Sequence, residues 1–431
     1  MTVLQTEASS EQVLYGRQSS LAVENFGTTG RRVADVPAFV RNYALVKAAA
    51  ARSNATLGVL APEAAGAIEA ACAEITSGLH GSQFPTALVL GGGGTTTNMN
   101  FNEVIAARAS QISGVAVHPN DHVNASQSTN DTYPTAMALT IRELSERPLQ
   151  ALTALALALE DKAAEYDTAQ RLGRTCLQDA VVLTVGQTHR SHATAIRRVA
   201  EGLRAATAEL DSIPIGATVL GTGIGAPDGY RELCVQDLSD ATGRQLAGSE
   251  DLVDALSHLD PYAAIASAGA RAAITMAKIA ADLRFLSSGP VGGIGEVTLP
   301  ATQAGSSIMP GKINPVIPEF VMQLSYRVRG AAHAVECAVA AGELELNIME
   351  PVIVDSLLNI FDDVAAAAGT FRRKCITGLA WDGRRLNENL AAGFDQWVTM
   401  AAEQGYDATT LAVATARTAG KTSTAGTEEA R

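Results

Sequence analysis

Residues 305–314, GSSIMPGKIN, place two hydroxyl side chains, one cation and one amide in a stretch that has no acidic residue. Ser306 and Ser307 follow one glycine, and Lys312 and Asn314 follow another. Hydroxyl, ammonium and amide groups all donate hydrogen bonds, and a segment without carboxylates does not repel an anion. This composition predicts an anion-binding loop whose glycines give the backbone the freedom that a closing lid requires.

Three further stretches concentrate small hydroxyl, amide and glycine residues between apolar segments. They are GGGGTTTNMNFNE at 91–103, NDHVNASQSTNDTYPT at 120–135 and LGRTCLQDA at 172–180. At the start of a helix, such side chains add donors to the free backbone N–H groups, which suits a carboxylate. Each stretch alone is also typical of ordinary helix capping. Together with residues 305–314, they predict one pocket for a carboxylate substrate.

Nucleotide-binding motifs fit the sequence poorly. The glycines at 91–94 are not followed by GK[ST], which argues against a phosphate-binding P-loop. GTGIG at 221–225 does not match GxGxxG after a strand, so a dinucleotide site is not expected. The chain also has no Ala-Ser-Gly triplet, from which a prosthetic group can form. Neither a nucleotide site nor such a prosthetic group is therefore expected.

The histidines do not form a convincing metal site. His189 and His192 are three residues apart, but no third ligand lies at a suitable spacing. His118 and His122 fall in a polar loop, where we expect their rings to hydrogen-bond to the backbone. The sequence therefore predicts no metal.

Long helices must position these loops. Apolar residues recur at i, i+3, i+4 and i+7 over about 135–166, 194–212, 261–287 and 316–341. No comparable region alternates with period two. The pattern predicts an all-α fold with a central bundle. We expect an N-terminal mixed helical domain at 1–129, the bundle at 130–371 and a small helical domain at 372–431 that ends in a disordered tail, AGKTSTAGTEEAR.

Composition narrows the class of protein. The 431 residues carry a net charge of −13, which argues against a nucleic-acid surface. They are 47% hydrophobic but only 4% aromatic, so small aliphatic side chains must form most of the core. Five scattered cysteines without a CxxC pair fit a reducing compartment. With no signal peptide and no apolar run of membrane-spanning length, we expect a cytoplasmic protein with no membrane contact.

The residues around the first loop carry a resemblance to a known family. GSSIMPGKINPVIPE closely resembles the signature loop of the aspartase/fumarase superfamily. Further blocks of that family recur in the same order, from about Tyr15 to the 370s: YGRQSSLAVENF, TTTNMNFNEVIAARA, HPNDHVNASQSTNDTYPTAM, GRTCLQDAV and GELELNIMEPVI. The resemblance implies a homotetramer with a twenty-helix core and active sites built from three subunits. It also implies reversible anti elimination from a succinyl-type substrate, without metal or cofactor.

The resemblance assigns the central chemistry to Ser306, which would be the base. Proton removal next to a carboxylate creates an aci-carboxylate dianion, so the rate depends on donors aimed at that second charge. A serine hydroxyl is a poor base in water, so it must be activated by desolvation and by surrounding donors. By the same resemblance, the donors to the aci-carboxylate are Thr95, Ser128, Thr129 and Ser307.

The remaining roles follow from the same motifs. Lys312 and Asn314 would hold the second carboxylate, while Asn130 and Thr175 would face the leaving group. Thr96, Cys176 and Met309 complete the expected substrate-binding set, with Thr188, His189 and Glu319 placed behind it.

Position 176 helps to distinguish members of the family. Fumarases carry histidine there, paired with the glutamate that matches Glu319, to handle water as the leaving group. A thiol cannot replace a positioned imidazole in that pair, so Cys176 disfavours a fumarase. STND at 128–131 and the ELELNIMEPVI block also resemble aspartases. The leading hypothesis is elimination of ammonia from L-aspartate to give fumarate.

Two alternatives remain open. Thr96, Thr188 and Gly225 depart from the family pattern near the amine side, which would suit an aspartate analogue or a betaine substrate with a different leaving group. A non-catalytic binding protein on the same scaffold is the other alternative. It is disfavoured because the base loop and its donors are all present.

Overall fold

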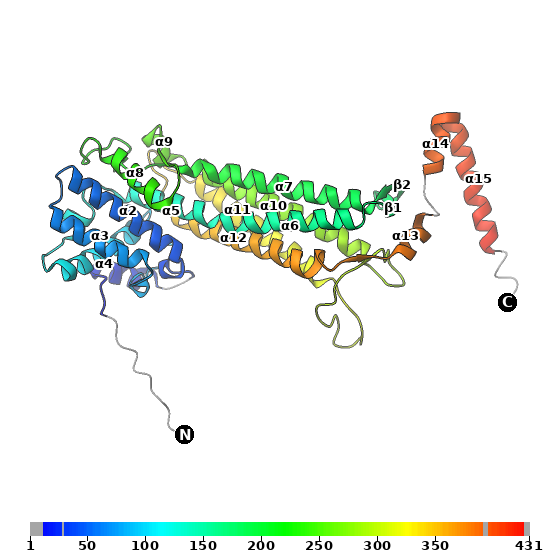
Figure 1. Cartoon of the computed structure of the whole chain (residues 1–431), viewed down its shortest axis with the longest axis horizontal. Coiled ribbons are helices and arrows are strands. Elements are labelled where there is room, and N and C mark those ends of the chain that lie inside the picture. Colours follow the sequence, from blue (N-terminus) through cyan, green and yellow to red (C-terminus); the bar gives the residue numbers. More distant parts are fainter. Residues whose placement is uncertain (1–11, 28–29, 391–394, 426–431) are drawn as a thin grey trace, which may run out of the picture. The chain divides into compact units, whose positions relative to one another are not determined.

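The computed structural model of the protein describes residues 12–27, 30–390 and 395–425, and Figure 1 shows its elements. The chain is mainly helical, which confirms the predicted all-α class. It divides into two compact units: unit 1 comprises residues 1–152, 198–275 and 323–367, and unit 2 the remainder.

Unit 1 holds the short helices of the N-terminal half. These are α1 (Arg17–Phe26), α2 (Pro37–Thr56), α3 (Pro62–Thr76), α4 (Thr95–Ser113), α5 (Thr129–Leu144), α8 (Tyr230–Thr242) and α9 (Leu252–Ser257). It also holds the short turns η1 (Val33–Asp35), η2 (Gly81–Gln83), η3 (Pro119–Val123) and η4 (Glu209–Asp211), and the parallel pair β3 (Ser212–Ile213) and β4 (Ala247–Gly248).

An aromatic cluster forms much of the core of unit 1. The rings of Tyr43 and Phe101 stack with centroids 4.3 Å apart, and Phe39 meets Tyr133 edge-on at 5.5 Å. Phe84 adjoins Phe101 at 4.4 Å. All five side chains are fully buried. Helices α2, α4 and α5 are therefore fixed against one another through large apolar contacts in an otherwise aliphatic chain.

Five long helices each contribute residues to both units. They are α6 (Glu146–Glu165), α7 (Val185–Ala208), α10 (Asp260–Leu286), α11 (Val316–Val339) and α12 (Glu350–Phe371). None of the described helices is long and apolar enough to cross a membrane.

Unit 2 contains the hairpin of β1 (Gln170–Thr175) and β2 (Gln178–Thr184) and the antiparallel pair of β5 (Val297–Thr298) and β6 (Ala380–Trp381). The turn η5 (Arg372–Ile376) and helices α13 (Gly383–Leu390), α14 (Asp395–Gln404) and α15 (Tyr406–Ala425) follow.

The structure corrects several expected elements. The helix expected over 135–166 is two helices, α5 and α6, which meet at Ser145. The helix expected at 194–212 begins earlier, at Val185. The hairpin of β1 and β2 shows that one region does form paired strands. Helix α15 ends at Ala425, residues 426–431 lie outside the described residues, and the expected disordered tail stays a prediction. The three expected domains and their two boundaries stay a prediction.

Candidate active site

The start of α4 carries Thr95 and Thr96 and depends on one glycine. Gly94 precedes the helix with φ +83°, and a Cβ there would lie 2.3 Å from Cδ2 of Tyr133. Only glycine combines this backbone conformation with such a close approach to α5. Thr95 is exposed and Thr96 is half-buried, so both hydroxyls remain available at a helix N-terminus, where free N–H groups favour anions.

Ser128, Thr129 and Asn130 form the start of α5. The Ser128 hydroxyl accepts a hydrogen bond from Asn130 N at 3.2 Å, while Ser128 N donates to Asp131 Oδ1 at 3.0 Å. These two hydrogen bonds form a capping box, so Ser128 acts as the N-terminal cap of α5. Asn130 Nδ2 donates to the carbonyl oxygen of Val219 at 2.8 Å.

Asp131 anchors this turn, and its importance was not predicted from the sequence. Its side chain is fully buried, and Oδ2 accepts from Gly216 N at 3.2 Å and Thr218 N at 3.0 Å. Burial raises the pKa of Asp131 to about 7, although these N–H groups and Ser128 N lower it in part. Asp131 thus ties the start of α5 to the segment after β3.

Lys47 forms a second buried link, again not predicted. Its ammonium donates to Asn124 Oδ1 at 3.1 Å and Gln127 Oε1 at 2.9 Å. Asn98 Nδ2 donates to Asn124 Oδ1 at 3.0 Å and to Thr129 Oγ1 at 3.1 Å. Burial lowers the pKa of Lys47 to about 7. This network joins α2, α4 and the residues just before α5, so it positions both expected carboxylate-binding helix starts.

The loop at 305–314 presents the hydroxyl of Ser306 to backbone donors. Ser306 Oγ accepts from Ile308 N at 3.2 Å and from Met309 N at 3.0 Å. Two N–H groups directed at one oxygen stabilise negative charge on it. The arrangement would therefore stabilise negative charge on this oxygen, as the expected role of Ser306 requires.

A short internal bridge closes this loop. Gly305 N donates to the Lys312 carbonyl oxygen at 2.8 Å, and Asn314 Nδ2 donates to the Gly305 carbonyl oxygen at 2.8 Å. A Cβ on Gly305 would lie 2.6 Å from Lys312 O, so this approach requires glycine. Ser307, Met309 and the Lys312 side chain are exposed. Within the described residues, the Lys312 ammonium has no ion-pair partner.

Cys176 and Leu177 form the two-residue tip of the hairpin. Both have left-handed backbones, with φ 52° and 61°, and Thr175 pairs with Gln178 across the turn. Such turns favour Asn-Gly, because most side chains strain at positive φ. Thr175 and Cys176 are exposed. Across the described chain, no hydrogen bond or ion pair joins this tip to residues 305–314.

A buried ion cluster supports the hairpin. Arg174 donates two hydrogen bonds to Glu296, at 3.1 and 2.6 Å, and Asn389 Nδ2 donates a third at 2.7 Å. The Glu296 side chain is fully buried, and Arg171 lies 3.5 Å from it. Burial raises the pKa of Glu296, but the hydrogen bonds outweigh this effect and leave the pKa below its usual value. The cluster fixes the hairpin to the segment before β5.

The residues expected behind the site have structural partners in unit 2. Thr188 Oγ1 accepts from Arg171 Nη1 at 3.3 Å, and His189 Nε2 accepts from the Trp381 indole N–H at 3.0 Å. Glu319 lies 3.7 Å from Arg284. In the part of the chain that the structure describes, no three His, Cys, Asp or Glu side chains are grouped to hold a metal ion.

The loop histidines behave as expected. His118 Nδ1 accepts from Asn120 N and Asp121 N, and His122 Nδ1 accepts from His118 N at 2.9 Å. Both rings therefore hydrogen-bond to the backbone, which confirms the prediction for this loop.

The buried pair His189 and His192 predicts acid sensitivity. Burial lowers their pKa values to about 3 and about 4. In unfolded chains histidine titrates near 6.5, so between pH ~6.5 and ~4 the unfolded state binds more protons. The contribution of this pair to the free energy of unfolding should therefore fall on acidification, by up to about 2.7 kcal/mol per pH unit for two protons. Denaturant titrations at several pH values measure this slope.

Removing one histidine of the pair tests this slope. His192→Gln should reduce it by about half. Equal slopes in wild type and His192→Gln would contradict the assignment.

The predicted site residues divide between the two units. Unit 1 holds Thr95, Thr96, Ser128, Thr129 and Asn130, and its buried network ties these helix starts together. Unit 2 holds the hairpin tip and the 305–314 loop, together with Thr188, His189 and Glu319.

Comparisons with known proteins identify the family. A family model described as "Lyase" matches residues 8–330. The chain is 40% identical over 376 residues to an aspartate ammonia-lyase of Helicobacter pylori, covering 86% of this chain and 80% of that protein. It is 38% identical over 414 residues to an aspartate ammonia-lyase of Pseudomonas aeruginosa, covering 94% and 87%.

Solved structures agree with this assignment. A fumarate lyase:delta crystallin from Brucella melitensis, crystallised with cobalt, superposes with a TM-score of 0.90 at 38% identity, covering 95% of this chain and 90% of that one. A class II fumarase from Schistosoma mansoni superposes with a TM-score of 0.89 at 30% identity, covering 93% and 88%. The chain therefore belongs to the lyase family, as an aspartase-like member of the aspartase/fumarase superfamily.

Proposed function

We propose that the chain eliminates ammonia from L-aspartate, reversibly and with anti geometry, to give fumarate. The observation that carries this proposal is the pair of backbone N–H groups, from Ile308 and Met309, that donate to Ser306 Oγ. The aspartate ammonia-lyases among its relatives support the choice of substrate.

In the first step, the Ser306 alkoxide removes a proton from the carbon next to one substrate carboxylate. The electron pair moves into that carboxylate and forms the aci-carboxylate dianion. Hydroxyl donors at the starts of α4 and α5 stabilise it, namely Thr95, Ser128 and Thr129, together with Ser307 of the base loop. Fixed donors in a closed site stabilise the dianion more than water does, because they need not reorient when the charge develops.

In the second step, the electron pair returns to form the C=C bond, and the C–N bond breaks. Ammonia departs, and fumarate carries both carboxylates of the substrate. Lys312 attracts the second carboxylate by its charge, and the Asn314 amide orients it by a directional hydrogen bond. Asn130 and Thr175 face the amine. An amine that leaves as ammonia needs no strong acid from the protein, so a thiol at Cys176 is compatible with this step.

We infer a homotetramer in which three subunits contribute to each site, as the resemblance to the aspartase/fumarase superfamily implies. The 305–314 loop would close over the substrate as a lid.

Purified full-length protein should release ammonia from L-aspartate and raise the ultraviolet absorbance that fumarate produces. D-aspartate is the matched control, since anti elimination from a fixed base discriminates between the two enantiomers. No product at millimolar L-aspartate, together with ammonia release from a different amine, would overturn the choice of substrate.

A second candidate, an aspartate analogue or a betaine with a different leaving group, is favoured by Gly225. This residue has φ +89°, a conformation that both glycine and asparagine tolerate, and a Cβ there would meet open space within 4 Å. The family commonly has asparagine at this position. This chain thus keeps a compatible backbone conformation there but lacks the amide side chain. A screen of succinyl and aminoacyl compounds by ammonia release decides between the candidates, with Cys176→His as a companion variant.

A further inference from the structure

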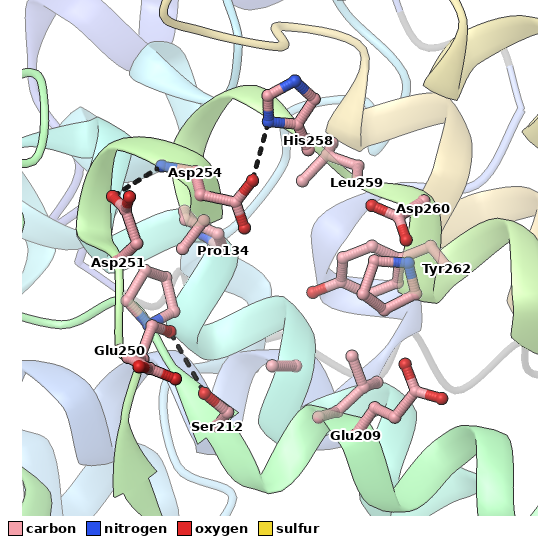
Figure 2. Close-up of a pocket in the computed structure, with 16 residues that line it drawn as sticks. Pro134, Glu209, Ser212, Glu250, Asp251, Asp254, His258, Leu259, Asp260 and Tyr262 are labelled. Atoms are coloured by element: carbon pink, nitrogen blue, oxygen red, sulfur yellow. Dashed lines mark hydrogen bonds and ion pairs between the residues drawn. The ribbon is translucent and has the colours of Figure 1, made fainter.

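Unit 1 contains a cavity of ≈ 400 Å³ that the proposed elimination does not use. Residues of α5, the η4–β3 segment, the residues before and within α9 and the start of α10 line it, as Figure 2 shows. Its volume lies within the range typical of small-molecule sites.

The lining of this cavity is strongly acidic. Its carboxylates are Glu209, Glu250, Asp251, Asp254 and Asp260. Among the residues that line it there is no lysine or arginine, and the imidazole of His258 lies 2.9 Å from Asp254 Oδ1. Such a field attracts cations and repels carboxylates. The cavity is therefore unsuited to the dicarboxylate of the proposed reaction.

The hydroxyl of a buried tyrosine side chain opens into the same cavity and points to a ligand there. Tyr262 is 5% exposed, and Figure 2 shows its hydroxyl directed toward the open centre of the ring of side chains. Within the described chain, this hydroxyl has no hydrogen-bond partner. Since no protein group in the described residues pairs with this hydroxyl at the cavity wall, it suits a donor or acceptor supplied by a bound molecule. The phenol ring can also face a cation.

The arrangement of the carboxylates excludes a single metal ion as the natural occupant. Asp251 accepts from Val253 N and Asp254 N as the cap of α9, and Asp254 faces His258. The three other carboxylates, Glu209, Glu250 and Asp260, stand on three separate segments. No three ligating groups converge among the described residues, whereas a metal ion requires several ligands within about 2–2.6 Å.

We propose that this cavity binds a linear aliphatic polyamine. Separated ammonium groups would each meet one carboxylate, and the Tyr262 hydroxyl would accept a hydrogen bond from an amine. The methylene segments between them would lie on apolar walls formed by Pro134, Leu210, Pro214 and Leu259. Spaced charges joined by methylenes match this lining, whereas a compact cation could satisfy only one carboxylate at a time.

Calorimetric titration of the full-length protein with spermidine tests the proposal. We expect one site per chain. Tyr262→Phe should weaken binding by roughly tenfold, which corresponds to one hydrogen bond to a charged group. Thermal stability without ligand should stay unchanged, because the hydroxyl has no partner to lose. The double variant Glu209→Gln with Glu250→Gln should weaken binding by roughly a hundredfold or more.

A second double variant tests whether the loss of negative charge outside the cavity also changes the affinity. Glu63→Gln with Asp161→Asn removes the same charge from exposed positions elsewhere and should leave the affinity unchanged. Pentylamine and Mg²⁺ should bind at least tenfold more weakly than spermidine. The proposal is overturned if wild type shows no heat of binding, if both double variants weaken binding equally, or if Mg²⁺ binds as tightly. Because the readout is binding alone, failure of the proposed turnover would not affect it.

Discussion

Replacing Ser306 by alanine should reduce the rate of elimination by about 10²- to 10⁴-fold, or below detection, because alanine offers no oxygen to take the proton. The fold should persist. The two N–H groups that now donate to Ser306 Oγ lie in an exposed part of the loop, where water can replace the hydroxyl. Initial rates of fumarate formation, together with a melting temperature for each protein, measure both effects.

Ser287→Ala is the matched control for this variant. Its hydroxyl donates only to the Arg284 carbonyl oxygen one turn back, so neither rate nor stability should change appreciably. A Ser306→Ala protein that keeps most of its turnover would show that another group is the base. If the melting transition of Ser306→Ala disappears, the loss of activity results from misfolding. Ser306→Thr, which keeps a hydroxyl, would then separate a loss of the base from a loss of the fold.

Replacing Asp131 by alanine should lower the free energy of unfolding by about 3–5 kcal/mol, because three backbone N–H groups lose a buried acceptor. These belong to Ser128, Gly216 and Thr218. Since Ser128 also starts α5, the expected carboxylate donors there lose their anchor, and KM should rise in whatever protein remains folded. Denaturant unfolding and steady-state kinetics measure the two effects.

Asp131→Asn separates two roles of the Asp131 side chain: hydrogen-bond acceptor and negative charge. The pKa of Asp131 is raised to about 7 in the folded protein, against about 3.9 when unfolded. Between these values this carboxyl binds more protons in the folded state, so its own contribution to wild-type stability falls as pH rises toward 7. The amide carries no such charge, and the deficit of Asp131→Asn relative to wild type should therefore be smaller at pH 8 than at pH 5. A deficit that grows with pH would contradict the burial of this carboxyl.

The features that the sequence predicts well are those with a local signal. Helix α10, at 260–286, was expected at 261–287, and α11 begins where its periodicity begins. The break at Ser145 was missed because the apolar pattern continues through it. The hairpin was missed because its tip is Cys-Leu, without the Asn or Gly that normally marks such a turn.

The residues of the candidate site also differ in whether the sequence carries a local signal for them. The 305–314 loop stands out because hydroxyls, glycines and a lysine without acids contrast with their neighbours. Lys47 and Asp131 were not predicted because their roles depend on partners far along the chain. Asn124 lies 77 residues from Lys47 and Thr218 lies 87 from Asp131. A lysine inside the apolar run ALVKAAA was the one available signal for the first of these.

The hairpin has a consequence for how this scaffold could diversify. Its tip is two residues long, and both residues have a strained backbone conformation, while the ion pair of Arg174 with Glu296 holds the strand just before the tip. Changes at 176 and 177 would thus alter side chains without disturbing what holds the strands. A randomised library at these two positions, with asparagine and glycine included, would test whether they select the leaving group, from a starting point where many substitutions relieve strain.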